Sequence, residues 1–404
     1  MTPQRPDSRN ARSKTMTMID GSDTYGVLNQ MPSNSNTFRL GVADSMGPRR
    51  FMEDAHSFVI DYAGVRGQGF FAVFDGHAGK HAAEWCGHHF HEYLLDTLHS
   101  NRNVPIPDVL NETFHNVDAN LSKMSEESDG KMHSGCTAVT AFLRIEDENG
   151  KQSFLDHDSF VKVESPGSTP APVGEAEADS VGESSKGRAN GKGSKLRHAL
   201  KNLSGSSLLS GSRSSHSRSP PRTSESPRSS IEHSPPTRVT SIQNPPANAR
   251  RVLYSANAGD ARGVLCRAGK AVRLTYDHKG SDKQEAKRIT DAGGFMMSGR
   301  VNGVLAVTRS LGDSSMKEFV VGSPYTTETE LCEDDEFLIL ACDGLWDVID
   351  DQSAVDLVRD IQDAQEASQK LLDYALGRTS DNVTVLLVRF KYGGDEVTKI
   401  LMHM

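Results

Sequence analysis

Acidic residues stand directly after apolar, strand-like runs in this sequence of 404 residues. The run from Phe70 to Phe74 stops at Asp75-Gly76-His77, and the run from Phe337 to Cys342 stops at Asp343-Gly344. A carboxylate at such a point can reach from a rigid scaffold into a cleft, and the glycine lets the backbone carbonyl approach a ligand. A single Asp-Gly pair is most often a turn, but two pairs in the same setting favour a functional site.

Further carboxylates occupy comparable places. Asp260 follows the strand-like segment at Tyr254, Asp381 precedes the segment that starts at Val383, and Glu53-Asp54 adjoin another such segment. Carboxylates that converge without a counter-charge repel one another and raise their own pKa values. Oxygen ligands in this number suit Mg²⁺ or Mn²⁺ better than zinc or copper. Two such ions bridged by one carboxylate are a standard arrangement for hydrolysing a phosphoester with a metal-bound hydroxide.

The composition excludes several classes of protein. The formal net charge is −9, but residues 151–250 carry +5 and residues 1–36 carry +1, which leaves about −15 on the rest. An acidic core is a poor match to a nucleic-acid binder and a good match to a protein that holds cations. No apolar run approaches the roughly 18 residues of a membrane span, so we expect neither a nucleic-acid nor a membrane partner. The absence of a secretory pattern and the scattered cysteines favour the cytoplasm or the nucleus.

Two blocks of strand and helix patterns are separated by residues 151–250, which are rich in Ser and Pro. A segment of this composition buries too little apolar area to fold. A strand-like run at 137–145 precedes it and another at 251–258 follows it, so we interpret it as an expanded hairpin, which costs only about 0.6 kcal/mol per doubling of loop length. We predict a disordered tail at 1–36, a catalytic domain at 37–395, a basic, disordered insert within it at 151–250, and a C-terminal tail at 396–404.

The elements that must position these residues have a mixed pattern. Further strands are predicted at 38–42, 56–60, 69–74, 261–267, 326–330, 337–342 and 383–390. Helical periodicity is found at 80–98, 109–124, 281–292, 351–360 and 365–376. Because the helices come in pairs instead of alternating singly with strands, the order disfavours a doubly wound parallel sheet. It favours an α+β sandwich with antiparallel sheets inside and helix pairs outside.

Short motifs that contain these acidic residues follow one another along the chain. They are Arg49–His56, Phe71–Gly79, Ser134–Ala138, Asn257–Arg262, Val304–Asp313, Leu340–Val348 and Ser380–Val385. Together they resemble, in family order, the motifs of the metal-dependent protein phosphatase family, type 2C, and the helix at Trp85-Cys86-Gly87 most resembles its fungal members. The resemblance implies a four-layer α/β/β/α sandwich and a protein-serine/threonine phosphatase that depends on Mg²⁺ or Mn²⁺.

The resemblance also implies which residues hold the metal ions. Asp75 would bridge two ions, and the backbone carbonyl of Gly76 would bind one of them. Asp343 and Asp381 would complete the site of the other ion. Glu53 would contribute beside Asp75.

Other matching positions have further implied roles. Arg49 would clamp the substrate phosphate, a task that suits a guanidinium fork. His77 would be the general acid that protonates the leaving serine or threonine oxygen. Asp260 and Asp347 match positions for a weaker third metal ion, and Asp54 matches an adjacent acidic position of the same site.

Several alternatives stay open. Arg50 could clamp the phosphate, although the spacing to Glu53 favours Arg49. The chain could be a pseudophosphatase that acts as a binding scaffold, or a phosphomonoesterase for small molecules. The likeness to fungal members suggests phosphorylated proteins of stress-activated MAP-kinase pathways as partners of a monomeric enzyme. The Ser-Pro pairs of the insert resemble targets of proline-directed kinases.

Overall fold

The computed structural model describes residues 13–15, 37–128, 132–155 and 242–390. The described residues belong to one structural unit, formed by the chain on both sides of the insert. Most of the predicted N-terminal tail, most of the predicted insert and residues 391–404 lie outside the described residues. In the described part, the helices are too short or too polar to cross a membrane.

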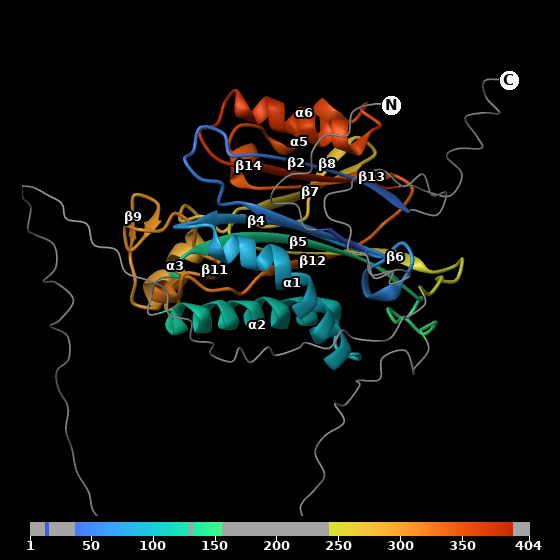
Figure 1. Cartoon of the computed structure of the whole chain (residues 1–404), viewed down its shortest axis with the longest axis horizontal. Coiled ribbons are helices and arrows are strands. Elements are labelled where there is room, and N and C mark those ends of the chain that lie inside the picture. Colours follow the sequence, from blue (N-terminus) through green and yellow to red (C-terminus); the bar gives the residue numbers. More distant parts are fainter. Residues whose placement is uncertain (1–12, 16–36, 129–131, 156–241, 391–404) are drawn as a thin grey trace, which may run out of the picture. The chain divides into compact units, whose positions relative to one another are not determined.

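Two sheets form the centre of the unit (Figure 1). Neighbouring strands are antiparallel, except that β1 (Ser13–Thr15) runs parallel to β3. The first sheet continues with β3 (Ala55–Ile60), β4 (Gly69–His77), β5 (Gly135–Glu146), β6 (Arg250–Ala258) and β12 (Tyr325–Glu330), and β11 (Leu311–Gly312) pairs with β5. The second sheet has the order β2 (Phe38–Ser45), β14 (Val383–Phe390), β13 (Asp335–Ala341), β7 (Arg262–Arg267) and β8 (Lys270–Arg273). A separate hairpin joins β9 (Met296–Met297) to β10 (Arg300–Val301).

The apolar run of β4 shows why the two sheets stack. Successive side chains of a strand point to opposite faces. Phe70 and Phe74 belong to the core under the outer helices, whereas Phe71 and Val73 belong to the core between the sheets. A strand that is buried on both faces needs a continuous apolar run instead of an alternating one.

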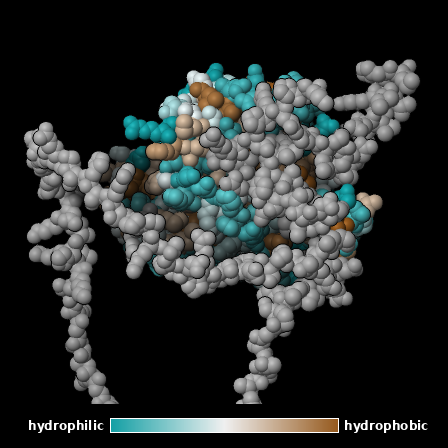
Figure 2. All heavy atoms as spheres, in the orientation of Figure 1, coloured by the Kyte–Doolittle hydropathy of each residue, from teal (hydrophilic) through white to brown (hydrophobic). Residues whose placement is uncertain are grey.

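Helix pairs cover the outer faces of both sheets (Figure 1). α1 (His81–Ser100) and α2 (Ile106–Glu127) cover the first sheet, and α5 (Asp351–Val358) and α6 (Ala364–Leu376) cover the second, together with the short α4 (Asp343–Trp346). The prediction of a four-layer α/β/β/α sandwich is therefore confirmed. On the face shown in Figure 2, the surface formed by the described residues is largely hydrophilic, as expected for helices that turn their apolar side inward.

Aspartates fix where several helices begin. Asp350 accepts a hydrogen bond from the backbone N–H of Ser353 at the start of α5, and Asp363 accepts one from Glu366 at the start of α6. Asp282 does the same for α3 (Lys283–Asp291). Each carboxylate satisfies an N–H group that has no partner within its helix.

The ends of the predicted insert lie against the sandwich. β5 and β6 pair from Ala138↔Ala258 to Glu146↔Arg250, so β6 begins inside the predicted 151–250 boundary. The Gln152 amide donates to Oε1 of Gln68 at 2.7 Å. Gln243 donates its backbone N–H to the Gly64 carbonyl at 2.9 Å. Residues 151–155 and 242–250 are therefore part of the folded unit.

Candidate active site

The pairing of the strands brings the predicted acidic residues to one place. Ala55, which follows Asp54, pairs with Phe74, which precedes Asp75. In the second sheet, the end of β13 pairs with the beginning of β14, so Asp343 and Asp381 lie at the same edge. The two edges lie close together, since the charges of Asp54, Asp343 and Asp381 all raise the pKa of Asp75.

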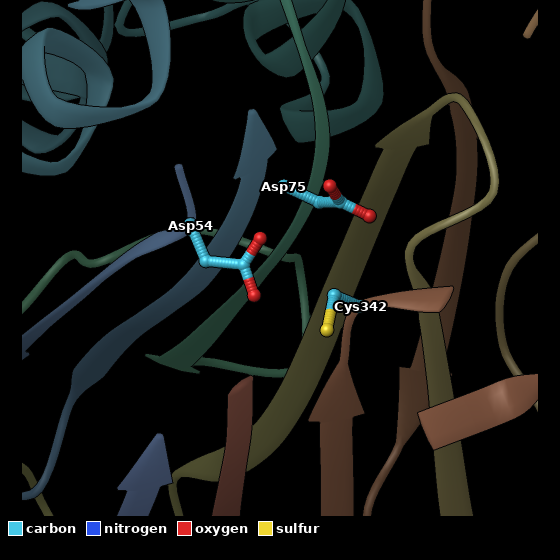
Figure 3. A group of neighbouring side chains, drawn as sticks. All are labelled: Asp54, Asp75 and Cys342. Carbon is cyan, nitrogen blue, oxygen red and sulfur yellow. The ribbon is translucent and has the colours of Figure 1, made fainter. Parts of the chain in front are cut away.

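The closest group consists of Asp54, Asp75 and Cys342, which come together from three different elements (Figure 3). One ligand atom of each residue lies within 4.8 Å of those of the others. Oδ2 of Asp54 also accepts a hydrogen bond from the Thr384 hydroxyl at 2.8 Å. Two carboxylates and a thiol therefore lie close together, with Asp54 and Cys342 buried and Asp75 half-buried.

Burial and mutual repulsion dominate the electrostatics of this cluster. Burial, followed by the charges of Asp343 and Asp54, raises the pKa of Asp75 well above its usual value. Burial is also the main reason why the pKa of Asp54 rises to about 7 and that of Asp343 to about 8. A divalent cation would offset this repulsion and keep the carboxylates ionised.

Asp260 supplies a second observation that fits a cation. Its Oδ1 is buried and has no hydrogen-bond partner within the described chain. A buried carboxylate oxygen without a partner is costly, and a metal ion can satisfy it. The oxygen-rich donors at this edge are those that Mg²⁺ and Mn²⁺ prefer. The residues present therefore fit the expected cofactor.

The positions predicted for a weaker third metal ion contain a lysine. Nζ of Lys279 lies 2.9 Å from Oδ1 of Asp347 and 3.4 Å from Oδ2 of Asp260. The structure thus places Asp260 and Asp347 on either side of one ammonium group. Lys279 was not among the site residues predicted from the sequence.

Glu53 and Gly76 lie beside each other. The Glu53 side chain accepts a hydrogen bond from the backbone N–H of Gly79 at 2.8 Å, which ties it to the loop after β4. A Cβ on residue 76 would overlap the Glu53 carbonyl, so a glycine is needed here. Asn382, another residue that the sequence analysis missed, accepts from the Glu53 N–H at 2.9 Å and donates to the carbonyls of Met46 and Phe51. Asn382 directly follows Asp381 in the motif Ser380–Val385, and this position could have identified it as a site residue.

The two predicted catalytic side chains each have an acidic partner. Nη2 of Arg49 lies 2.6 Å from Oδ2 of Asp381, and half of the arginine side chain, 51%, is exposed. Its neighbour Arg50 is exposed too. Nε2 of His77 lies 2.7 Å from Oδ2 of Asp313, a residue that the sequence analysis placed in a motif without giving it a role.

The sandwich is that of a known family. A sequence profile described as Protein phosphatase 2C matches residues 38–147 and 188–384, more than half of the chain. The chain belongs to this family. The prediction of a protein-serine/threonine phosphatase is thereby confirmed.

Particular relatives agree with this assignment. The chain is 38% identical over 357 residues to Protein phosphatase 2C homolog 1 of Saccharomyces cerevisiae, covering 87% of this chain and 93% of the relative. It is 35% identical over 370 residues to the protein of the same name from Schizosaccharomyces pombe, covering 91% and 77%. The predicted likeness to fungal members is confirmed.

Solved structures share the fold at lower identity. A serine-threonine phosphatase 2C from Toxoplasma gondii superposes with a TM-score of 0.56 at 18% identity, covering 89% of this chain and 97% of that chain. A sex-determining protein of C. elegans gives a TM-score of 0.59 at 20% identity, covering 89% of this chain and 66% of the other. Both likenesses support the predicted α+β sandwich.

Proposed function

We propose that this phosphatase requires Mg²⁺ or Mn²⁺, and that it binds two ions with a weaker third. The observation that carries the proposal is the group of converging carboxylates, Asp54, Asp75 and Asp343. Asp54 is buried and the other two are half-buried, and burial and their mutual repulsion raise their pKa values. When bound, the ions would supply a hydroxide nucleophile at neutral pH and would neutralise the phosphoryl oxygens. Phosphoserine and phosphothreonine in proteins are the proposed substrates.

The proposed metal-binding residues follow the sequence prediction. Asp75 and the Gly76 carbonyl would hold the ions together with Asp343, Asp381 and Glu53. Their positions at the ends of β4, β13 and the beginning of β14 support this assignment. Asp260, Asp347 and Asp54 would serve the weaker third position.

Two further residues of the chain would act directly on the substrate. Arg49 would bind the phosphate, and its contact with Asp381 holds the guanidinium at the rim of the acidic edge. His77 would donate a proton to the leaving oxygen of the substrate. Both side chains reach solvent, His77 with 25% of its surface, as residues that meet a macromolecular substrate must.

The test measures phosphate release from a phosphoserine peptide with and without added Mg²⁺ or Mn²⁺. We expect turnover only with the cation, and we expect Asp75→Asn or Asp343→Asn to lower it by at least about 100-fold, since metal ions contribute several kcal/mol to such reactions. The control is Asp356→Asn, which changes an exposed carboxylate of α5. Turnover that needs no divalent cation and survives Asp75→Asn would contradict the proposal.

Two measurements separate this proposal from the alternatives. A pseudophosphatase scaffold predicts that calorimetry detects no binding of Mg²⁺ or Mn²⁺. A small-molecule phosphomonoesterase predicts faster turnover of sugar phosphates than of phosphopeptides. We expect cation binding and a preference for phosphopeptides.

We also propose that the enzyme acts as a monomer in the cytoplasm or the nucleus, on phosphorylated components of stress-activated MAP-kinase pathways. The fungal relatives are protein phosphatases by name, which supports phosphorylated proteins as substrates. Phosphoproteomes of cells that lack the gene should show increased phosphorylation of such components. Unchanged phosphorylation of these pathways would contradict the role, and comparison with cells that carry a deletion of residues 151–250 would test whether the insert determines the substrate.

A further inference from the structure

A buried carboxylate faces the predicted general acid from another part of the chain. Oδ2 of Asp313 lies 2.7 Å from Nε2 of His77, and the Asp313 side chain is 8% exposed. The hydroxyl of Ser310 donates a hydrogen bond to the same oxygen. Asp313 is therefore an acceptor that is held in place and directed at the histidine ring.

The backbone is shaped to bring this carboxylate to His77. Asp313 has a φ of 49°, a left-handed conformation that is uncommon for residues other than glycine. Its carboxylate lies on Gly135, where an added Cβ would overlap it. Gly135 pairs with both His77 and Gly312, so the strands β4 and β11 lie on either side of β5 at this point.

A helix of the outer layer anchors the same loop. Oδ1 of Asp118, on α2, accepts a hydrogen bond from the Gly312 N–H at 2.9 Å and lies 2.7 Å from Nζ of Lys317. Lys317 also donates to the Ser310 carbonyl at 2.9 Å. Because both sides of Asp313 are fixed, its carboxylate keeps one position relative to the ring of His77.

We propose that Asp313 is a positioning residue for His77, and this inference rests on the proposed function. Asp313 accepts the Nε2–H bond of His77 and thereby leaves Nδ1 as the ring nitrogen that serves the substrate. A carboxylate that accepts a hydrogen bond from one ring nitrogen fixes the orientation of a catalytic imidazole. Gly312 and Asp118 do not contact His77 in this proposal. They act on the histidine only by fixing the position of Asp313.

The assisted step is the departure of the serine or threonine oxygen. Water forms a bond to phosphorus and releases a proton to solvent, while the bond between phosphorus and the seryl oxygen breaks. The electron pair of that bond stays on the seryl oxygen, which takes the proton from His77. The histidine regains a proton from solvent, and the products are the free hydroxyl group and inorganic phosphate.

The kinetic test compares two substrates that differ in their need for this proton. A phosphoserine peptide has a poor leaving group, which needs a proton. The leaving group of p-nitrophenyl phosphate is a stable phenolate, which departs without a proton. General acids contribute about 10²–10⁴-fold, so we expect Asp313→Ala to lower kcat for the peptide by about 10- to 100-fold. We expect kcat for p-nitrophenyl phosphate to change by less than about 3-fold, and KM for the peptide to stay within the same limit.

Further variants make the test specific. Asp313→Asn keeps the shape and tolerates the left-handed backbone, and we expect a smaller loss, again on the peptide alone. His77→Gln should show the same substrate dependence, and adding Asp313→Ala to it should cause no further loss. Asp335→Asn, at a fully buried carboxylate that pairs with Arg267 at 2.7 Å, is the matched control and should affect both substrates equally. An equal loss on both substrates for Asp313→Ala, or losses that multiply in the double variant, would overturn the proposal.

A spectroscopic measurement on the metal-free full chain does not depend on turnover. With ¹⁵N-labelled histidine, His77 should carry its proton on Nε2 in the wild type, and Asp313→Ala should shift the population towards the other tautomer. An unchanged tautomer would overturn the positioning role. Wild-type protein that hydrolyses neither substrate with Mg²⁺ or Mn²⁺ would overturn the proposed function instead, and the two failures are therefore distinguishable.

Discussion

Lys279 lies between two carboxylates that the family resemblance assigns to a third metal ion. Its Nζ is 2.9 Å from Asp347 and 3.4 Å from Asp260, and the charges of these carboxylates raise the pKa of the lysine although burial opposes this. The ammonium group therefore competes with a cation for the same oxygens. We predict that Lys279→Met strengthens the weakest Mn²⁺-binding step by about 10-fold, because one nearby positive charge is worth roughly 1–2 kcal/mol at a partly exposed site.

Calorimetric titration with Mn²⁺ measures this effect. Lys283→Met removes an exposed lysine at the start of α3 and should leave all binding steps unchanged. Weaker Mn²⁺ binding in Lys279→Met would contradict the prediction, since it would mean that the lysine organises the carboxylates instead of competing for them.

Arg49 and Arg50 form a natural pair for testing the phosphate clamp. Both side chains are exposed, but Arg49 is held by Asp381 at 2.6 Å. A hydrogen bond to a charged group is worth about 1.5–3 kcal/mol, so Arg49→Ala should lower kcat/KM for a phosphopeptide by roughly 10- to 150-fold. Arg50→Ala should change it by less than about 2-fold. The reverse order of the two effects would identify Arg50 as the clamp.

At the scale of elements, an ion-pair network joins α3 to the segment that leads to Asp313. Glu285 lies 2.6 Å from Arg309 and 3.0 Å from Arg288, and it accepts a hydrogen bond from the Thr308 hydroxyl. Burial alone would raise the pKa of Glu285, but hydrogen bonds and charges of the two arginines outweigh burial and lower it to about 2. The ionised carboxylate therefore stabilises the folded state.

The pKa of Glu285 sets the pH range in which the ion-pair network stabilises the folded state. Since the folded pKa lies below the usual value of 4.5, the stabilisation is complete above about pH 4.5 and is lost as the pH falls towards 2. Glu285→Gln should lower the free energy of unfolding at pH 7 by about 2 kcal/mol, or the Tm by roughly 4–8 °C. The difference from wild type in thermal melts should shrink below about pH 4. Glu336→Gln, at an exposed pair with Arg359, should cost less than about 1 kcal/mol, and an equal cost at the two sites would contradict the prediction.

Most elements could be predicted from the sequence, because buried strands and amphipathic helices leave local patterns. The strand predicted at 383–390 has these bounds in the structure, and the helix predicted at 365–376 begins one residue earlier. Other boundaries shift by one to a few residues. The helix predicted at 109–124 spans Ile106–Glu127, and the strand expected to stop before Asp75 continues to His77, since backbone pairing with residues 135–137 does not depend on the side chains. Elements of two to four residues, such as β11 and α4, carry too short a pattern to be recognised.

The candidate site was predictable to the extent that it lies at strand ends. Antiparallel pairing brings the ends of neighbouring strands together, so the meeting of Asp54 with Asp75 in one sheet and of Asp343 with Asp381 in the other could be expected. Lys279 and Asp313 were missed as site residues for the opposite reason. Their contacts join positions far apart in sequence, 68 residues between Lys279 and Asp347, and follow no strand or helix period.

At the scale of the whole molecule, the insert connects two strands, β5 and β6, that are paired without interruption. β5 and β6 stay paired up to Glu146↔Arg250, and Gln152 and Gln243 attach the next residues to the sandwich. Replacing residues 156–241 by about six Gly and Ser residues keeps all of these contacts. It shortens the loop from roughly 90 residues to about six, which should stabilise the fold by about 2 kcal/mol through the smaller loop-closure entropy.

Two deletions of different length distinguish the effect of lost contacts on stability from the effect of loop-closure entropy. We predict that the variant without residues 156–241 melts at or above the wild-type temperature and hydrolyses p-nitrophenyl phosphate normally. A longer deletion, of residues 151–249, also removes the hydrogen bonds that Gln152 donates to the Gln68 side chain and to the Ile145 carbonyl, and the one that Gln243 donates to the Gly64 carbonyl. Since a typical intramolecular hydrogen bond contributes about 0.5–1.5 kcal/mol to stability, this variant should melt below the shorter deletion. If the shorter deletion itself melted well below wild type, residues 156–241 would contribute packing to the domain, and the interpretation of the insert as an expanded loop would be wrong.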